Sequence, residues 1–467
     1  MHAAVMRPSD ALVMVLLAIA LVLGMTQTTP TLSLQIVLGC LVILVAFTSV
    51  SASLYLLIFS MLLSPEIAIG RMQGQGVGGR EISIRGDDVL LIVIGLSWLV
   101  KTAVYRDLAL FRETSLNRPI FYYMLVCVMA TLLGVLSGRV RPTTGFFFVM
   151  KYFEYFFVFF MVVNHVTTKQ QVVRLVIALF ITCLIISFYA ISQIPSGQRA
   201  TAPFEGEAGE PNTLGGYLVF MMAILTGFWL HVKEMPIRTG LAIFLGLITL
   251  ALLATLSRSS YLAAAALLCA VVATQWRRPR VLVLVMVVMM LIPLLAPSNV
   301  KQRVSDTFFG RQYGTEVKIG AVALDSSTSE RLRSWAYVVN DWVYHPLLGR
   351  GVTGYAWADA QYVKILGETG LAGLVTFSIL IGRLWKRARK AFLSEQDPFC
   401  KGLAHGFLLG MVAMLVHAVG ANTFILIRIM EPFWLCAGLV MLLPTLEDKQ
   451  PGDLPVPSAP FIPALVR

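Results

Sequence analysis

Apolar runs long enough to cross a lipid bilayer recur from one end of the chain to the other. A run such as "TLSLQIVLGCLVILVAFTSV" is apolar on every face, which is typical of a transmembrane helix. A transmembrane β-barrel would instead show segments of about ten residues with alternating hydrophobicity. The sequence therefore predicts an all-α, polytopic membrane protein, and its 57% hydrophobic against 13% charged residues fit that class.

The runs predict about twelve to fourteen transmembrane helices, because one or two short runs could be re-entrant or fused. They are centred on residues 10–25, 31–49, 51–66, 88–104, 120–136, 145–164, 172–192, 213–230, 239–256, 259–275, 280–296, 361–382, 403–420 and 424–444. The first run lacks a small-residue cleavage signature, which favours an uncleaved span over a signal peptide. No segment is long enough for a separate soluble domain, so we expect residues 1–467 to form one integral membrane domain.

Lysine and arginine in short connections predict the orientation of the chain. The segments "KTAVYRDLALFRETSLNR", "QWRRPR" and "RLWKRARK" are basic, and the positive-inside rule places all three on the cytoplasmic side of the membrane. Both termini then lie inside, and the outward segments are 66–87, 137–144, 193–212, 257–260 and 297–360. The net charge of +12 requires no nucleic-acid partner, because topology and anionic lipid headgroups account for it.

The longest outward segment, residues 297–360, contains a predicted amphipathic helix. Ser327 and Glu330 form a capping-box pattern, and apolar residues recur at helical spacing until Pro346 ends the run. These apolar residues are Leu332, Trp335, Ala336, Val339, Trp342 and Val343. We expect the helix to lie at the membrane surface, with Arg331 and Arg333 near its start.

Positive charges on the predicted outer face are mostly arginine rather than lysine. The positive-inside rule disfavours them there, and a planar guanidinium suits phosphate or carboxylate better than topology requires. The arginines are Arg71, Arg80, Arg85, Arg139, Arg141, Arg199, Arg258, Arg303, Arg311, Arg331, Arg333 and Arg350, and the lysines are Lys301 and Lys318. For each arginine, snorkelling or pairing with a nearby carboxylate is the alternative to anion binding.

Arg258 is the strongest single candidate for an anion-binding residue. It lies in "LLATLSRSSYLAAAALL", a turn between two apolar runs that is too short to reach far into water. Its guanidinium is therefore predicted to face a cavity at the outer membrane boundary, with a lipid-headgroup anchor as the alternative. Arg199 precedes an irregular Pro- and Gly-rich loop, after which Asn212 or Thr213 could cap the next span.

Charged residues inside the predicted spans have structural explanations. Lys151 with Glu154, and Arg428 with Glu431, have the spacing to pair along one helix.

No metal, disulfide framework or cofactor is expected. Asp87 and Asp88 open a span, where the helix dipole favours carboxylates, although a metal-binding pair is an alternative. The histidines His165, His405 and His417 show no ligand at metal-binding spacing, and the cysteines Cys40, Cys127, Cys183, Cys269, Cys400 and Cys436 show no CxxC pattern.

Three stretches together resemble the O-antigen ligase and polysaccharide polymerase family of bacterial membrane glycosyltransferases. They are "TLSRSSYLA", "SERLRSWAYVVNDWVYHPLLGRGVTGY" and "ADAQYVKILGETGLAGLV". The shared features are a serine-arginine pair at the start of a span, an arginine and a tryptophan four residues apart, a His-Pro before Gly-x-Gly, and a later Glu-x-Gly. The resemblance runs from about Arg199 to about Leu374 and is unspecific for the substrate.

The resemblance implies a GT-C-like fold and an undecaprenyl-pyrophosphate-linked glycan as donor. Arg199, Arg258 and, with less support, Arg331 would hold the pyrophosphate, because fixed guanidinium groups can stabilise the departing charge without a metal. Further substrate-site candidates are Arg333, His345 and Glu368. The expected partners are the lipid-linked glycan and membrane lipids, with a flippase and chain-length regulators as candidate partner proteins.

One departure from the family pattern favours a polymerase. Ligases of the family carry a His-Asn pair where this chain has Asp359 and Ala360, and polymerase-like members more often resemble an Asp-Asn version. Asp359 is therefore a candidate base, with a helix cap as the equal alternative. His345 is a second candidate base, although its position beside Pro346 favours a turn cap.

Three other functions remain open from the sequence. A ligase would use the same chemistry with lipid A-core as acceptor. A flippase or exporter of lipid-linked sugars would also need cationic cavities, but such transporters usually show two repeated halves and charges at mid-membrane. A structural assembly subunit is the third, because a fold alone does not establish an activity.

Overall fold

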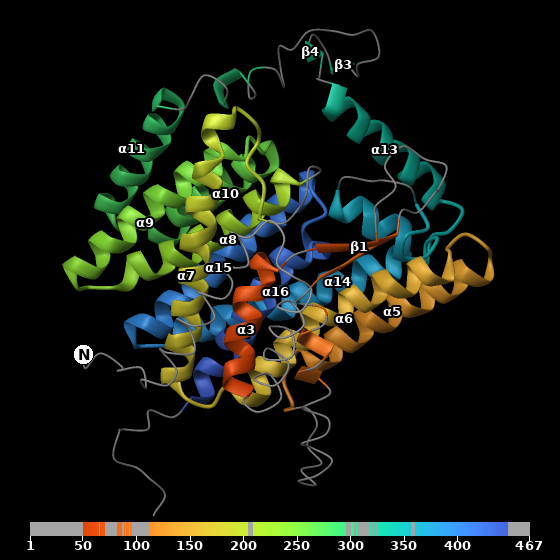
Figure 1. Cartoon of the computed structure of the whole chain (residues 1–467), viewed down its shortest axis with the longest axis horizontal. Helices are drawn as coiled ribbons and strands as arrows, with labels where there is room; N and C mark the ends of the chain where they lie inside the picture. The colour runs from red at the N-terminus through yellow and green to blue at the C-terminus, as the bar shows by residue number, and fades with distance from the viewer. Residues whose placement is uncertain are drawn as a thin grey trace, which may run out of the picture.

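The structure is a computed structural model in which the chain forms a helical bundle (Figure 1). Its description covers residues 50–64, 66–70, 82–85, 112–203, 209–295, 326–355 and 360–446, with isolated residues at 88–95, 300–305, 318–319 and 322–323. Eight of the described helices are long and apolar enough to cross a membrane. The all-α, polytopic class is thereby confirmed. The total of twelve to fourteen spans stays a prediction, because two predicted spans and most of a third lie outside the described residues.

Twelve α-helices are described. They are α3 (Val50–Leu63), α5 (Asn117–Leu136), α6 (Pro142–His165), α7 (Lys169–Ser192), α8 (Pro211–His231), α9 (Met235–Ala254), α10 (Arg258–Gln275), α11 (Pro279–Leu295), α13 (Ser326–Trp342), α14 (Gln361–Ser394), α15 (Pro398–Gly420) and α16 (Ile427–Leu442). Short 3₁₀ turns follow α7, precede α16 and follow α16, at Ile194–Ser196, Thr423–Ile425 and Leu443–Thr445. Two small antiparallel hairpins lie between helices, β1 (Glu66–Gly70) with β2 (Ile82–Arg85) and β3 (Lys318–Ile319) with β4 (Val322–Ala323).

Helices α8, α15 and α16 form the centre of the bundle. Between 78% and 89% of their most apolar windows are buried, compared with 17% for α9, which lies at the opposite flank from α5 and α6 (Figure 1). Glycines let α8 and α15 approach backbone to backbone, since a Cβ atom on Gly227 would lie 2.3 Å from the nitrogen of Gly406. Close contact of this kind replaces the hydrophobic driving force that is absent between helices in lipid.

Proline and capping side chains fix where several helices begin. Pro142, Pro211 and Pro398 stand in the first turns of α6, α8 and α15, where a missing N–H costs no hydrogen bond. Thr168 and Gln171 form a capping box at the start of α7.

Helix α14 contains a sharp break at Gly370. Its backbone angles, φ 65° and ψ −163°, lie in a region that is essentially restricted to glycine. The break is held from outside the helix, because Leu371 N and Ala372 N donate to the carbonyl oxygens of Pro346 and Leu347 at 2.8 and 3.1 Å. As a result, α14 consists of a first part, residues 361–369, and a longer second part, residues 371–394.

Successive connections between helices lie alternately at the two ends of the bundle. At one end, which we call the arginine end, Ala200 N donates to Ala254 O, Phe424 N to the Gln361 side chain, and Val352 N to Thr131 Oγ1. The opposite end gathers the connections 166–168, 232–234, 276–278 and 395–397. The arginine end contains described residues of the segments 137–144, 193–212, 257–260 and 297–360, which the sequence analysis predicts to face outward.

The "RLWKRARK" segment, treated above as a loop, is helical. It continues the second part of α14 beyond the predicted span, and α14 ends only at Ser394. Charged side chains ended the apolar run in the sequence, but lysine and arginine are good helix formers and the helix continues through them.

Candidate active site

The turn between α9 and α10 places Arg258 at the start of a helix. Leu256 takes a left-handed conformation with φ 48°, which reverses the chain within a few residues. Ser257 then caps α10, because its hydroxyl accepts a hydrogen bond from Ser260 N at 3.3 Å. Arg258 is thus the first residue of α10, and its side chain is half-buried.

Arg258 and Arg331 line one pocket of about 180 Å³, which we call the arginine pocket. Its lining comes from α10, α13 and α15 and consists of Arg258, Ser259, Leu262, Thr328, Arg331, Leu332, Trp335, Val419 and Gly420. Ser259 Oγ donates to Gly420 O at 3.0 Å and so ties the α10 wall to the α15 wall. Two guanidinium groups from segments about 70 residues apart around one small pocket are suited to bind a phosphate or carboxylate.

A buried hydrogen-bond network fixes the start of α10 to the neighbouring helices. Ser257 Oγ donates to Asn212 Oδ1 at 2.7 Å and lies 2.8 Å from Ser260 Oγ. Ser260 Oγ lies 3.2 Å from His417 Nε2, and His417 Nδ1 lies 2.8 Å from Thr423 Oγ1. The network joins α8, α10, α15 and the turn before α16, so it fixes the helix that carries Arg258.

Arg199 lies beside the same turn. Its Nε donates to the carbonyl oxygen of Thr255 at 3.3 Å, three residues before Arg258. Arg333, in contrast, is exposed, although it lies only two residues after Arg331 on α13. The structure therefore brings Arg258, Arg331 and Arg199 to one region and leaves Arg333 at the surface of that helix.

Glu368 anchors a loop, which explains its burial. The side chain is 2% exposed, and its Oε1 accepts hydrogen bonds from Thr353 N at 3.0 Å and Lys364 Nζ at 2.6 Å. Its carbonyl oxygen accepts from Gly351 N at 2.8 Å. These contacts hold the Gly-x-Gly loop against the first part of α14.

His345 forms the turn that follows α13. Its backbone N donates to Trp342 O at 2.8 Å, its carbonyl accepts from Gly349 N at 3.1 Å, and its ring contacts the carbonyl of Tyr344. These contacts support the turn-cap interpretation rather than a role as base.

An ion pair closes the loop between α13 and α14. Asp341 contacts both the Arg350 guanidinium and the Tyr355 hydroxyl. Burial alone would raise the pKa of Asp341, but the hydrogen bonds from Tyr355 and Arg350 lower it below its ordinary value. Asp359 follows this loop in the sequence but lies outside the described residues. The N-cap residue of α14 is Ala360, whose side chain has no hydrogen-bond acceptor. Asp359 therefore does not occupy the N-cap position.

The histidines of α15 have partners that the sequence analysis missed. His417 belongs to the network under Arg258, and His405 Nδ1 lies 3.1 Å from His231 Nε2 at the opposite end. The sequence analysis considered only metal ligands at short spacing, whereas His231 and Ser260 lie 174 and 157 positions away from their partners. The signal was present, since a polar residue in an apolar span needs a partner.

The structure also shows the contacts of the other polar residues that the sequence analysis named. Lys151 Nζ pairs with Glu154 at 3.2 Å as predicted, and it contacts Asp88 as well. Arg428 is buried and donates from Nη1 to the carbonyl oxygen of Pro203 at 2.9 Å. Asn212 accepts from Ser257 rather than capping α8, whose N-cap is Glu210. Among the described residues, no three His, Cys, Asp or Glu side chains gather as metal ligands would.

Comparison with known protein families gives a match for the middle part of the chain. Residues 241–378 match the family model described as O-Antigen ligase. This range contains Arg258, Arg331, His345 and Glu368, whereas Arg199 and His417 lie outside it. Among curated proteins, none matches the chain in sequence.

Proposed function

We propose that this chain, whose residues 241–378 match the O-antigen ligase family model, is a membrane glycan-transferring enzyme and, more specifically, a polymerase. It joins oligosaccharide repeat units that are linked to undecaprenyl pyrophosphate, on the outer face of the bacterial cytoplasmic membrane. The observation that carries this proposal is the arginine pocket, where Arg258 and Arg331 meet from separate segments at one end of the bundle.

The arginine pocket suits the leaving group of this reaction. An acceptor hydroxyl attacks the anomeric carbon, the bond from that carbon to the pyrophosphate oxygen breaks, and the electron pair leaves with the pyrophosphate. Guanidinium groups fixed before the reaction stabilise this developing charge without having to reorganise. The network from Asn212 to Thr423 supports the proposal because it immobilises the start of α10.

Asp359 is the proposed base that takes the proton of the attacking hydroxyl. It stands one residue before Ala360, the N-cap of α14, and that helix begins at the arginine end. Asp359→Asn removes the basicity with little change in side-chain size, so we expect a large loss of turnover with donor binding retained. Turnover at the wild-type rate would move the search to His345 and Glu368.

The second candidate is a ligase that transfers the glycan to lipid A-core, and the description of the matched family model favours it. Purified protein is incubated with an undecaprenyl-pyrophosphate oligosaccharide, with and without lipid A-core, and the products are separated by size. A ladder of products indicates a polymerase, and one transfer to lipid A-core indicates a ligase. Movement of the donor across vesicles without any transfer would indicate a flippase instead.

The orientation in the membrane is part of the same proposal. We expect the arginine end to face outward and both termini to lie inside, because of the short-loop charge bias. In a variant without native cysteines, Gln198→Cys and Lys390→Cys place exposed thiols at the arginine end and at the opposite end. An impermeant thiol reagent should label only position 198 in intact cells, and labelling of position 390 would reverse the orientation.

A further inference from the structure

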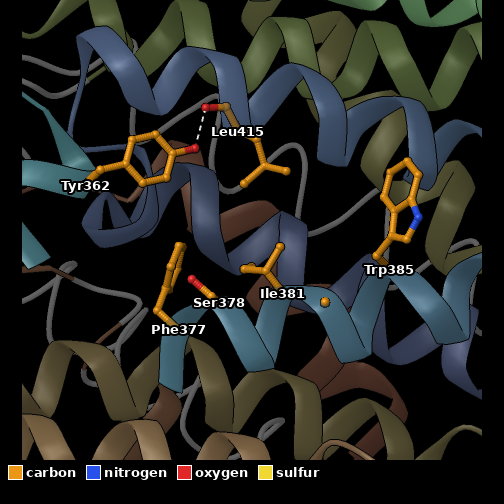
Figure 2. Close-up of a pocket in the computed structure, with 7 residues that line it drawn as sticks. Tyr362, Phe377, Ser378, Ile381, Trp385 and Leu415 are labelled. Carbon is orange, nitrogen blue, oxygen red and sulfur yellow. Dashed lines mark hydrogen bonds between the residues drawn. The ribbon is translucent and has the colours of Figure 1, made fainter. Parts of the chain in front are cut away.

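A second hollow lies between α14 and α15, apart from the arginine pocket. It is a groove of about 320 Å³, lined by Tyr362, Phe377, Ser378, Ile381, Gly382, Trp385 and Leu415. Figure 2 shows Phe377, Ile381 and Trp385 along one helix, Leu415 on its neighbour, and Tyr362 at one end. We call this hollow the α14–α15 groove.

The groove offers apolar surface rather than hydrogen-bonding groups. The hydroxyl of Tyr362 donates to Leu415 O at 2.7 Å, and the hydroxyl of Ser378 donates to Leu374 O at 2.7 Å. Both hydroxyl groups therefore donate their hydrogen bond within the protein rather than to a ligand. Ser378, Gly382 and Trp385 are exposed on a helix that crosses the membrane, so the groove suits a long hydrocarbon chain.

The break at Gly370 shapes this groove, and Gly382 lines it. The break separates the first part of α14, which carries Tyr362, from the second part, which carries the rest of the α14 wall. Tyr362 then bonds across to α15 and closes one end. At Gly382 a Cβ atom would meet no heavy atom within 4 Å, so the space beside this residue is open and a larger side chain could be placed there without a clash.

The closed end of the groove lies close to the arginine pocket. Leu415 lines the groove, and Val419, four residues later on α15, lines the arginine pocket. Residues at this spacing share one face of a helix and differ in height by roughly 6 Å. A molecule with a charged head and a long apolar chain can therefore occupy both hollows at once.

We propose that the α14–α15 groove binds the polyprenyl chain beyond its first two isoprene units, when the pyrophosphate of the same molecule lies in the arginine pocket. This inference rests on the proposed lipid-pyrophosphate donor. It assigns Gly382 a role in substrate binding that its lack of a side chain would otherwise conceal. The groove selects the donor by its chain, whereas the arginines select it by its charge.

Filling the groove from Gly382 tests the proposal. Gly382→Phe places an aromatic ring in the groove, and Gly246→Phe on α9 is the matched control, because a Cβ atom there also meets nothing within 4 Å. Two donors carry the same oligosaccharide on undecaprenyl or on geranyl pyrophosphate, and KM is measured for each. The wild type and Gly246→Phe should prefer the undecaprenyl donor. Gly382→Phe should raise KM for that donor about tenfold and leave KM for the geranyl donor unchanged.

Binding is measured separately from transfer, with a photoreactive undecaprenyl pyrophosphate. We expect crosslinks to peptides of α14 and α15 that excess undecaprenyl pyrophosphate removes and excess phosphatidylglycerol does not. Equal displacement by phosphatidylglycerol, or an unchanged chain-length preference in Gly382→Phe, would overturn the groove proposal alone. If the wild type transfers the glycan from neither donor, the proposed function fails instead.

Discussion

The two ends of the bundle use the same cationic residues in different ways. At the opposite end, Lys169 pairs with Asp397 at 2.9 Å, and the Arg278 guanidinium donates to Leu230 O at 3.3 Å. Arg238 stacks over the ring of Trp229 at 4.4 Å. The arginine end also contains paired cations, such as Arg350 with Asp341. In addition, Arg258 and Arg331 line a pocket there.

This difference teaches that position, rather than residue type, separates the functional cations from the structural ones. The structural cations, which occur at both ends, contact carboxylates, carbonyl oxygens and aromatic rings. The proposed functional cations surround a space that a small anionic group can enter. Substitutions of matched residues at the two ends test whether the distinction holds.

The largest effect is expected for Arg258. Arg258→Ala should lower kcat/KM at least about 100-fold with the protein still inserted, because the main stabiliser of the departing charge is lost. Arg258→Lys should restore only part of the rate, because a point charge cannot make the two-pronged contact. Arg199→Ala should behave similarly, because Arg199 is bonded to the same turn.

The matched substitution for Arg258 is Arg277→Ala, because Arg277 stacks on Trp276 at the opposite end. It should leave transfer unchanged. Near-normal transfer by Arg258→Ala would make Arg258 a lipid anchor and remove the contrast between the ends.

A smaller effect is expected on α13, where two arginines can be compared on one helix. Arg331 lines the arginine pocket and Arg333 is exposed. Arg331→Ala should raise KM for the donor roughly tenfold, as loss of a charged hydrogen bond would, and Arg333→Ala should change it less than twofold. Steady-state kinetics with a lipid-linked donor decides this, and equal effects would place the pyrophosphate outside the pocket.

The two buried histidines of α15 give the next test. His417→Leu leaves the hydroxyls of Ser260 and Thr423 without their partner, so α10 loosens and kcat should fall about fivefold. His417→Gln should recover part of the rate, because an amide can still bond to a hydroxyl. His405→Leu breaks comparable contacts at the opposite end and should lower thermal stability without a change in kcat.

The smallest effect on transfer is expected at Asp397. Burial alone would raise its pKa, but the Cys400 N–H and Lys169 lower it below its ordinary value. A lowered pKa means that Asp397 contributes stability above the pKa of the unfolded chain, about 3.9, and that the contribution is lost as pH falls through the folded pKa. Asp397→Ala should destabilise the protein by about 1 kcal/mol at pH 7, with KM unchanged. Thermal unfolding of the wild type and the variant should converge in acid.

Much of the fold follows from the sequence because apolar runs report membrane spans directly. The predicted runs at 120–136, 145–164 and 172–192 correspond to α5, α6 and α7, which begin three residues earlier in each case. Helix starts are missed because the first turns contain polar or proline residues that hydropathy discounts. The break at Gly370 was not predicted, because it depends on carbonyl oxygens of Pro346 and Leu347 that reach α14 only through the fold.

The candidate site was predictable in its arginines but not in their support. Arg258 and Arg331 stand out because cations are disfavoured outside, and the structure places both in one pocket. The supporting residues Asn212 and His417 are separated from Ser257 by 45 and from Ser260 by 157 positions. No local pattern reports contacts of that range. The hydrogen bond from Thr353 N to Glu368 was also not predicted, while the substrate role of Glu368 stays a prediction.

The close contact between α8 and α15 has a consequence for biosynthesis. The ribosome completes α8 at His231 but begins α15 only at Pro398, which at typical elongation rates is a delay of roughly 10–30 s. During this interval the glycine-lined face of α8, including Gly227, cannot meet its final neighbour. The nascent chain must spend that time with this face against lipid or against the insertion machinery. A pause or a truncation before residue 398 should therefore yield a protein that is inserted but lacks its centre.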